Sequence, residues 1–198
     1  MREEFKKIGK DLFLHGMVSS HGGNLSVRVG DRILITRRGS MLNHLEDRDV
    51  VETGLERNDS GIILASTEIG VHRAIYKATS ALAVVHCHPV YTVAISLAAD
   101  EIIPVDSEGS YILHKVPVVA AEHTAGSKEV ERIVPEVLRQ YKVVVLRGHG
   151  IFSAGQLLEE AFQYSSVLEV SAKMLYLTSA MKAEIKEYRK ASGQYGTW

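Results

Sequence analysis

The order of strand-like and helix-like segments constrains the fold most, because it mixes a tight hairpin with longer crossover connections. Residues 25–29 (LSVRV) and 32–36 (RILIT) alternate in polarity around a two-residue Gly-Asp link, which predicts a β-hairpin with glycine where a type II′ turn favours it. Apolar runs at 82–89 and 143–146 predict buried strands. Helical patterns separate these runs, so we expect an α/β protein with a mixed, mainly antiparallel sheet and helices on its faces.

The remaining elements are assigned from periodicity and capping residues. A first helix over roughly residues 1–15 ends at Gly16. Ser66 or Thr67 is the expected N-cap of a helix that follows a short strand at 62–64. The other expected elements are a helix at 91–99, strands at 111–113 and 116–119, a helix at 127–139, a strand at 151–154 and a long helix at 157–181.

Composition limits the kinds of partner. Apolar residues make up 45% of the 198 residues and charged residues 24%, a balance that excludes intrinsic disorder. The formal net charge of −1 gives no positive field for a nucleic-acid backbone, so nucleic acid is not an expected partner. No internal repeat or linker-like shift is present. We therefore expect one domain over 1–198, with a mobile C-terminal tail from about 190.

Localisation is expected to be cytoplasmic. The N-terminal stretch is charged and amphipathic, without the apolar core of a signal peptide, and no run of about 18 apolar residues occurs, so no membrane partner is expected. A single cysteine, Cys87, cannot form an internal disulfide, and this fits a reducing compartment.

Three histidines form the strongest candidate site. Side chains alternate along a strand, so His86 and His88 project to the same side while Cys87 points away. Taken alone, the pair is compatible with two hydrogen-bonded core histidines. His149, between two glycines directly after another predicted strand, allows three imidazoles to converge. Three neutral imidazoles with an open fourth position are typical ligands of a catalytic zinc ion.

Two further segments indicate anion binding. A helix that begins at Ser66-Thr67-Glu68 would direct free backbone amides and its positive dipole end toward a phosphate, although Glu68 is also compatible with an ordinary capping role. The second segment combines the Gly22-Gly23-Asn24 loop with the Thr36-Arg37-Arg38-Gly39-Ser40 turn, whose glycine amides and an arginine could hold an anion. A plain surface turn with a solvated basic pair is the alternative, and spacing alone favours it.

The motifs GGNLSVR, LIT..G, STE, HCHP and RGHG occur in this order, and together they resemble the class II aldolase family of L-fuculose-1-phosphate aldolase and L-ribulose-5-phosphate 4-epimerase. The resemblance covers nearly the whole chain. It implies a single three-layer α/β/α domain, a C4 homotetramer with active sites at subunit interfaces, and one Zn²⁺ per subunit.

The resemblance also implies individual roles. His86, His88 and His149 match the zinc ligands. Glu68 matches the catalytic acid/base, which can serve as a fourth ligand. The positions that match those holding the sugar phosphate are Asn24, Gly39, Ser66 and Thr67.

Two segments depart from the family pattern. Arg37 and Arg38 stand where the family usually has proline and a hydroxyl residue, so Arg38 could supply a charge to the phosphate instead. Glu108 stands where fuculose phosphate aldolase has a tyrosine that helps protonate the leaving group, with Tyr111 three residues later. Both are candidates for the second acid/base, and a carboxyl here also resembles methylthioribulose-phosphate dehydratase of the same superfamily.

The function implied is a zinc-dependent aldehyde-lyase that cleaves a ketose 1-phosphate, such as L-fuculose 1-phosphate, to dihydroxyacetone phosphate and an aldehyde. A sugar-phosphate epimerase, dehydratase or decarboxylase of the same family is the alternative. A non-catalytic module like the adducin head is a third reading, but such a module has no need for three imidazoles and a carboxylate. A Schiff-base mechanism is disfavoured, because Lys77 is the only lysine near these motifs.

Other residues have smaller expected roles. His21 could approach the phosphate, His72 is expected to pack or bond locally, and Tyr195 is a candidate lid residue. The histidines expected to be structural, capping or at the surface are His15, His44, His114 and His123.

Overall fold

The computed structural model describes residues 1–182 and 184–186. Its elements are α1 (Arg2–Leu14), β1 (Asn24–Val29), β2 (Arg32–Thr36), β3 (Val50–Gly54), α2 (Ile69–Ala78), β4 (Ala83–Cys87), α3 (Val90–Ser96), β5 (Glu101–Ile102), α4 (Ser107–Ile112), β6 (Val116–Val119), α5 (Lys128–Leu138), β7 (Val143–Leu146), β8 (Gly150–Gly155) and α6 (Leu158–Ala180), with short 3₁₀ helices η1 (Leu42–His44), η2 (Asp47–Asp49) and η3 (Ser60–Ile63). The tail from about 190 and Tyr195 lie outside the described residues.

The strands form one sheet in the order β3-β2-β1-β4-β8-β7-β6-β5. Neighbouring strands are antiparallel except β6 and β7, which are parallel. This confirms the predicted mixed, mainly antiparallel sheet. The predicted hairpin is confirmed as well: Val29 pairs with Arg32 across the two-residue turn, where Gly30 has a φ of 61°.

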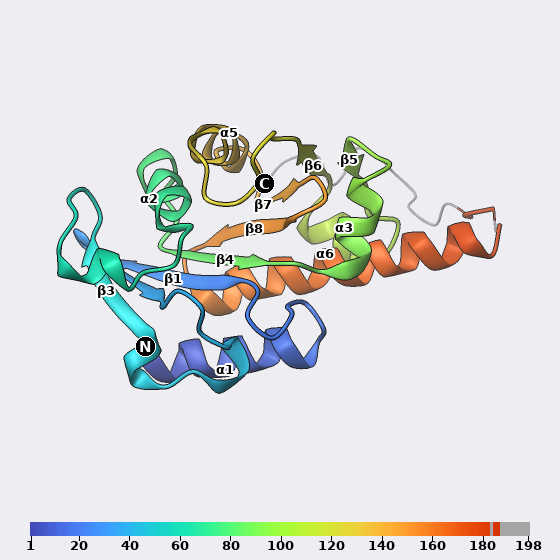
Figure 1. Cartoon of the computed structure of the whole chain (residues 1–198). Coiled ribbons are helices and arrows are strands. Elements are labelled where there is room, and N and C mark those ends of the chain that lie inside the picture. The colour runs from blue at the N-terminus through green and yellow to red at the C-terminus, as the bar shows by residue number, and fades with distance from the viewer. Residues whose placement is uncertain (183, 187–198) are drawn as a thin grey trace.

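Helices cover both faces of the sheet. Figure 1 shows α2 and α5 on one face and α1 and α6 on the other. Alternate residues of β4 enter two separate hydrophobic clusters: Val85 and Cys87 pack toward α1 and α6, while Val84 packs toward α2 and α5. His86 therefore lies on the α2 and α5 face, one residue away from the apolar core around Cys87.

Two predicted strands are wrong. Residues 62 and 63 lie in the 3₁₀ helix η3 and residue 64 is its C-cap, because the Asp59 carboxylate caps this helix by accepting a hydrogen bond from the Gly61 N–H at 3.1 Å. Residues 111–113 belong to the end of α4, which Asp106 caps by accepting from the Gly109 N–H at 2.8 Å. In both places a local side-chain cap competes with strand formation.

One helix start is also corrected. Helix α2 begins at Ile69, with Glu68 at the N-cap position, and not directly after Ser66 or Thr67. The Ser66 hydroxyl still accepts a hydrogen bond from the Glu68 N–H at 3.3 Å. The shift places the Glu68 side chain at the N-terminal end of the helix, before its first turn.

Candidate metal centre

The three predicted histidines converge at one edge of the sheet. His86 is the penultimate residue of β4 and pairs with Phe152 of β8, His88 follows β4, and His149 lies in the turn that leads into β8. The Nε2 atoms of His86 and His88 are 2.9 Å apart, and the ring centroids of the three imidazoles lie 4.8, 5.0 and 4.9 Å from one another. One nitrogen from each ring falls within 4.8 Å of the others, which is the reach of a single bound cation.

Backbone geometry allows this approach. The turn Leu146–His149 places Gly148 at a φ of 69°, a conformation that a side chain would strain. A Cβ at Gly150 would overlap the Cys87 carbonyl and lie 2.6 Å from Cδ2 of His88. The glycines of the RGHG motif thus allow the imidazoles of His88 and His149 to lie against each other.

The ring of His86 is held in one tautomer. Its Nδ1–H donates to the carbonyl of Ile151 at 2.9 Å, and the ring stacks on Phe152 at 4.2 Å. The lone pair of Nε2 therefore faces the other imidazoles. Burial lowers the pKa of His86 and of His88 to about 3, so both rings are neutral at physiological pH, as metal ligands must be.

The carboxylate of Glu68 lies beside the imidazoles and is only 4% exposed. Its Oε2 accepts a hydrogen bond from Asn24 Nδ2 at 2.9 Å and lies 3.0 Å from Nε2 of His86. Its Oε1 is buried and has no hydrogen-bond partner among the described residues, and the same is true of Nδ1 of His149. The cluster thus contains buried polar atoms that no described residue satisfies.

This arrangement fits a divalent cation. Glu68 Oε2 and His86 Nε2 both present lone pairs, and two facing acceptors repel each other unless a cation or proton lies between or beside them. Three imidazoles and one carboxylate form the donor set of a four-coordinate site of the zinc type, whereas calcium or magnesium would need more oxygen ligands.

A cavity of about 180 Å³ opens beside the imidazoles. Its lining includes every residue predicted to bind the metal or the phosphate, namely Asn24, Arg38, Gly39, Ser66, Thr67, Glu68, His86, His88 and His149. His21 lines it too. The histidine cluster and the turn predicted to bind an anion therefore line one cavity, whose size and polar lining suit a small ligand with a phosphate at one end.

The two arginines of the anion-binding turn behave differently. Arg37 is bound to Asp49, with Nε and Nη2 at 2.8 and 2.7 Å from Oδ1. Arg38 is exposed, and its side chain makes no hydrogen bond or ion pair with any residue that the structure describes. Arg38 is thus the guanidinium available to an anion in the cavity.

The two candidates for the second acid/base lie elsewhere in this chain. Glu108 and Tyr111 belong to α4, are exposed, and do not line the cavity. Glu108 lines a different hollow against α6, together with Leu157 and Val170. A single copy of the chain therefore brings together the histidines, Glu68 and the phosphate residues, but not these two.

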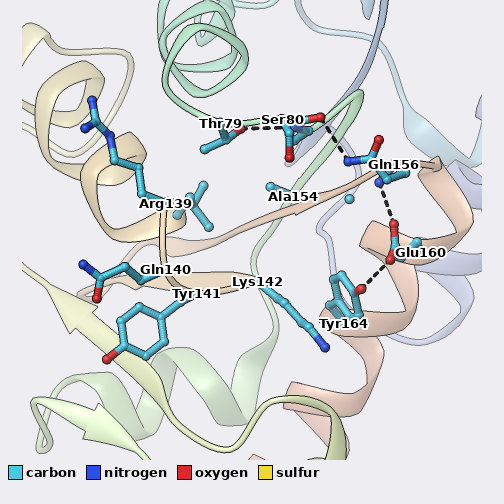
Figure 2. Close-up of a pocket in the computed structure, with 13 residues that line it drawn as sticks. Thr79, Ser80, Arg139, Gln140, Tyr141, Lys142, Ala154, Gln156, Glu160 and Tyr164 are labelled. Carbon is cyan, nitrogen blue, oxygen red and sulfur yellow. Dashed lines mark hydrogen bonds between the residues drawn. The ribbon is translucent and has the colours of Figure 1, made fainter. Parts of the chain in front are cut away.

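A second polar cavity lies at the other end of the strands β4, β7 and β8 (Figure 2). It has a volume of about 270 Å³, but its polar side chains are hydrogen-bonded within the lining: the Tyr164 hydroxyl donates to Glu160 at 2.5 Å, and the Gln156 amide donates to the Ser80 backbone carbonyl at 3.0 Å. No buried polar atom in its described lining lacks a partner. The candidate function therefore belongs to the histidine cavity.

Fold and cluster define an α/β protein with three histidines that could hold a metal ion, and comparisons with known proteins give its family. The model of the class II aldolase and adducin N-terminal domain matches residues 3–176, and the chain belongs to this metal-dependent family. A crystal structure of L-fuculose-1-phosphate aldolase from Thermus thermophilus is 36% identical, with a TM-score of 0.86, and covers 93% of this chain and 97% of that one.

Curated relatives carry more than one activity. A protein named L-fuculose phosphate aldolase from Methanocaldococcus jannaschii is 30% identical over 91% of this chain and 98% of its own length. A protein named methylthioribulose-1-phosphate dehydratase from Acidiphilium cryptum is 31% identical over 84% of this chain and 85% of its own. The family resemblance of the motifs is thereby confirmed, and the relatives of this chain include enzymes of the lyase type.

Among the described helices, none has the length and apolar character needed to cross a bilayer.

Proposed function

We propose that this protein is a zinc-dependent class II aldolase that cleaves a ketose 1-phosphate of the L-fuculose 1-phosphate kind to dihydroxyacetone phosphate and an aldehyde, acting in the cytoplasm. One observation carries the proposal: the three imidazoles, the unpartnered Oε1 of Glu68 and the anion-binding residues all line the same cavity. The likeness to a solved aldolase over almost the whole of both chains supports it.

His86, His88 and His149 would hold the cation, and Glu68 could serve as a fourth ligand. When bound, the cation supplies positive charge that stabilises electrons developing on the substrate's oxygens. The phosphate would lie against the hydroxyls of Ser66 and Thr67.

Three other groups would complete phosphate binding. They are the second N–H of the Asn24 amide, the backbone N–H of Gly39 and the guanidinium of Arg38. Each can donate to phosphate oxygens, and the guanidinium adds a positive charge.

Proton transfer is assigned to Glu68 and a second group. In cleavage, the C4 hydroxyl loses its proton, the C3–C4 bond breaks, and its electron pair stays with C3, which then gains a proton. Oε1 of Glu68, after taking up a proton from water, would deliver that proton to C3, because Oε2 is held by Asn24. The second group would release the proton of the C4 hydroxyl to water, so the net transfer is one proton from the C4 hydroxyl to C3, and atoms and charge balance.

The second group would come from another copy of the chain. Glu108 or Tyr111 of an adjacent subunit would take the C4 hydroxyl proton in a C4 homotetramer, since both lie outside the cavity of their own chain. Helix α6 supports this assembly. Its C-terminal half runs past the sheet (Figure 1) and leaves Met174, Tyr176 and Leu177 41%, 52% and 46% exposed. A helix that is apolar on several faces is usually buried by a partner.

The direct test measures products. Zinc-loaded protein is incubated with ketose 1-phosphates that differ in their far end, and dihydroxyacetone phosphate is measured with a coupled reduction assay. Release of dihydroxyacetone phosphate together with an equal amount of aldehyde supports the aldolase assignment. Phosphorylated product without carbon–carbon cleavage would contradict it.

A dehydratase is the second candidate. Glu108 offers a carboxyl where the resemblance to fuculose phosphate aldolase implies a tyrosine, and a protein named as a dehydratase is among the relatives. Mass spectrometry of the product distinguishes the two: a dehydratase yields a product lighter by one water. An epimerase would leave the mass unchanged, and a decarboxylase would release carbon dioxide.

A further inference from the structure

A buried row of hydrogen bonds leads from the carboxylate of Glu68 into the core between α2 and the sheet. Asn24 Nδ2 donates to Glu68 Oε2 at 2.9 Å, and Asn24 Oδ1 lies 2.6 Å from His72 Nε2. His72 Nδ1 lies 2.6 Å from the Ser26 hydroxyl, which lies 2.5 Å from the Tyr76 hydroxyl. None of the five side chains in this row is more than 7% exposed.

Chain geometry explains why these residues meet. Glu68, His72 and Tyr76 follow one another at intervals of four along the start and body of α2, so they share one side of the helix. Asn24 and Ser26 alternate along β1 and point to the same face of the sheet. The helix therefore lies with its polar row directly over the polar row of the strand.

The donor and the acceptor of each hydrogen bond in the row follow from the chemistry of the groups at its two ends. A carboxylate only accepts, so the amide nitrogen of Asn24 must face Glu68, and the amide oxygen must face His72. Nε2 of His72 must then carry the proton. In the neutral ring Nδ1 is left as the acceptor of the Ser26 hydroxyl.

The far end is determined in the same way. Ser26, having donated to His72, accepts from the Tyr76 hydroxyl. The single hydrogen of the Ser26 hydroxyl is already given to His72, so the Tyr76 hydroxyl must be the donor in this pair. Burial lowers the pKa of His72 to about 3 and raises that of Tyr76, so both side chains stay neutral at physiological pH.

We propose that His72 is a positioning residue for the lyase site: by donating from Nε2 to Asn24 Oδ1, it holds the Asn24 amide in the one orientation that binds Oε2 of Glu68. This inference rests on the proposed function, because it assigns Glu68 Oε1 to proton transfer. With Oε2 held, Oε1 is directed into the cavity. The second N–H of Asn24 stays available to the phosphate.

The flipped orientation of the Asn24 amide is disfavoured at both of its contacts, with Glu68 and with His72. A flipped Asn24 would place its oxygen against Glu68 Oε2 and its nitrogen against the N–H of His72. Acceptor would then face acceptor, and donor would face donor, in a buried site where neither can be hydrated. Without His72 only Glu68 would select the orientation, and the carboxylate itself would be less restrained.

The kinetic test compares His72→Leu, which removes both ring hydrogen bonds, with His72→Gln, whose amide can donate to Asn24 and accept from Ser26. Val71→Ala, a buried residue of the same helix outside the row, is the control for lost packing. We expect His72→Leu to lower kcat about 10- to 100-fold with metal content retained, the range found for residues that orient a ligand. His72→Gln should recover most of this loss, and Val71→Ala should lower stability without a matching loss of kcat.

A double-mutant comparison tests whether His72 acts through Glu68. In a Glu68→Gln background, His72→Leu should cause no further loss of kcat, because the group it positions no longer transfers a proton. Additive losses in the two variants would overturn the proposal, as would full kcat in His72→Leu.

A measurement on the unmodified protein separates this inference from the proposed function. ¹⁵N NMR of the His72 ring should show a neutral imidazole with the proton on Nε2 and a hydrogen-bonded acceptor at Nδ1, whether or not any substrate is turned over. A proton on Nδ1 would overturn the His72 assignment even if the aldolase reaction is found. Failure to cleave any ketose 1-phosphate would instead contradict the proposed function and leave the NMR result to decide the orientation of Asn24. If His72→Leu does not fold, the Gln variant and this spectrum still decide the question.

Discussion

Oε2 of Glu68 and Nε2 of His86 face each other at 3.0 Å inside the protein, although His86 already donates its other ring nitrogen to the Ile151 carbonyl. Two acceptors at this distance need positive charge nearby. The pair therefore links the metal ligands to the proposed acid/base, and the first two predictions follow from it.

Removal of the cation should inactivate and destabilise the protein. We expect chelation to lower kcat/KM at least about 100-fold, since the cation's charge stabilisation amounts to several kcal/mol. The melting temperature should fall too, because a ligand bound only by the folded state stabilises it. His149→Ala should reproduce both effects, while His123→Ala, at an exposed histidine outside the cluster, should not. Metal analysis and thermal unfolding provide the measurements, and undiminished activity after complete chelation would contradict the metal assignment.

Glu68→Gln should separate metal binding from turnover. Glutamine has nearly the same shape and can still accept from Asn24, but it cannot take up or release a proton at neutral pH. We expect kcat to fall roughly 100- to 10,000-fold, the usual contribution of a general acid/base, while the three imidazoles retain the metal. Steady-state kinetics with metal content measured on the same sample tests this. Unchanged kcat would remove Glu68 from proton transfer.

Arg38→Ala should affect substrate binding, whereas Arg37→Ala should affect stability. The Arg38 side chain has no partner among the described residues and lines the cavity, so its loss should raise KM for a phosphorylated substrate about 10- to 100-fold, as expected for one charge-assisted hydrogen bond. Arg37 is bound to Asp49, so its loss should lower the free energy of unfolding and change KM little. Titration with inorganic phosphate gives an independent measure of affinity. A larger rise of KM in the Arg37 variant would refute the division of roles.

The Arg37–Asp49 pair should also contribute to stability in a pH-dependent way. Burial raises the pKa of Asp49, but hydrogen bonds from the Glu46 backbone N–H and from Arg37 outweigh it, so the folded-state pKa lies below its ordinary value. The stabilisation is therefore present above the unfolded pKa, at about 4, and is lost as pH falls through the folded pKa.

Asp49→Asn should accordingly cost about 1–2 kcal/mol of unfolding free energy at pH near 7 and progressively less below about pH 4. Urea unfolding at several pH values measures the difference from the unmodified protein. Asp31→Asn, in the exposed turn between β1 and β2, is the matched control and should show no such trend. A cost that stays constant into acid would argue against a charged Asp49 in the folded state.

Local patterns account for much of the fold that the sequence predicts correctly. Alternation of side chains along a strand is enough to place His86 and His88 on one side of β4, and a two-residue link with glycine is enough to predict the β1–β2 hairpin. Local patterns also explain the errors. Asp59 and Asp106 cap short helical turns that apolar residues alone made look like strands.

The sequence alone therefore determined the family, the β1–β2 hairpin, the strands β4, β6, β7 and β8, and the identity of the candidate ligands, because these depend on residues close together in the chain. Only the tertiary structure decided which residues of distant segments meet. The order of strands brings β8 beside β4 and so places His149 next to the imidazoles of His86 and His88. The packing of α2 on β1 brings Glu68 to Asn24, 44 residues away in the chain. Only the folded chain assigned Arg37 to Asp49 and left Arg38 for the cavity, since contacts across the sheet depend on strand register and helix packing, which no local pattern specifies.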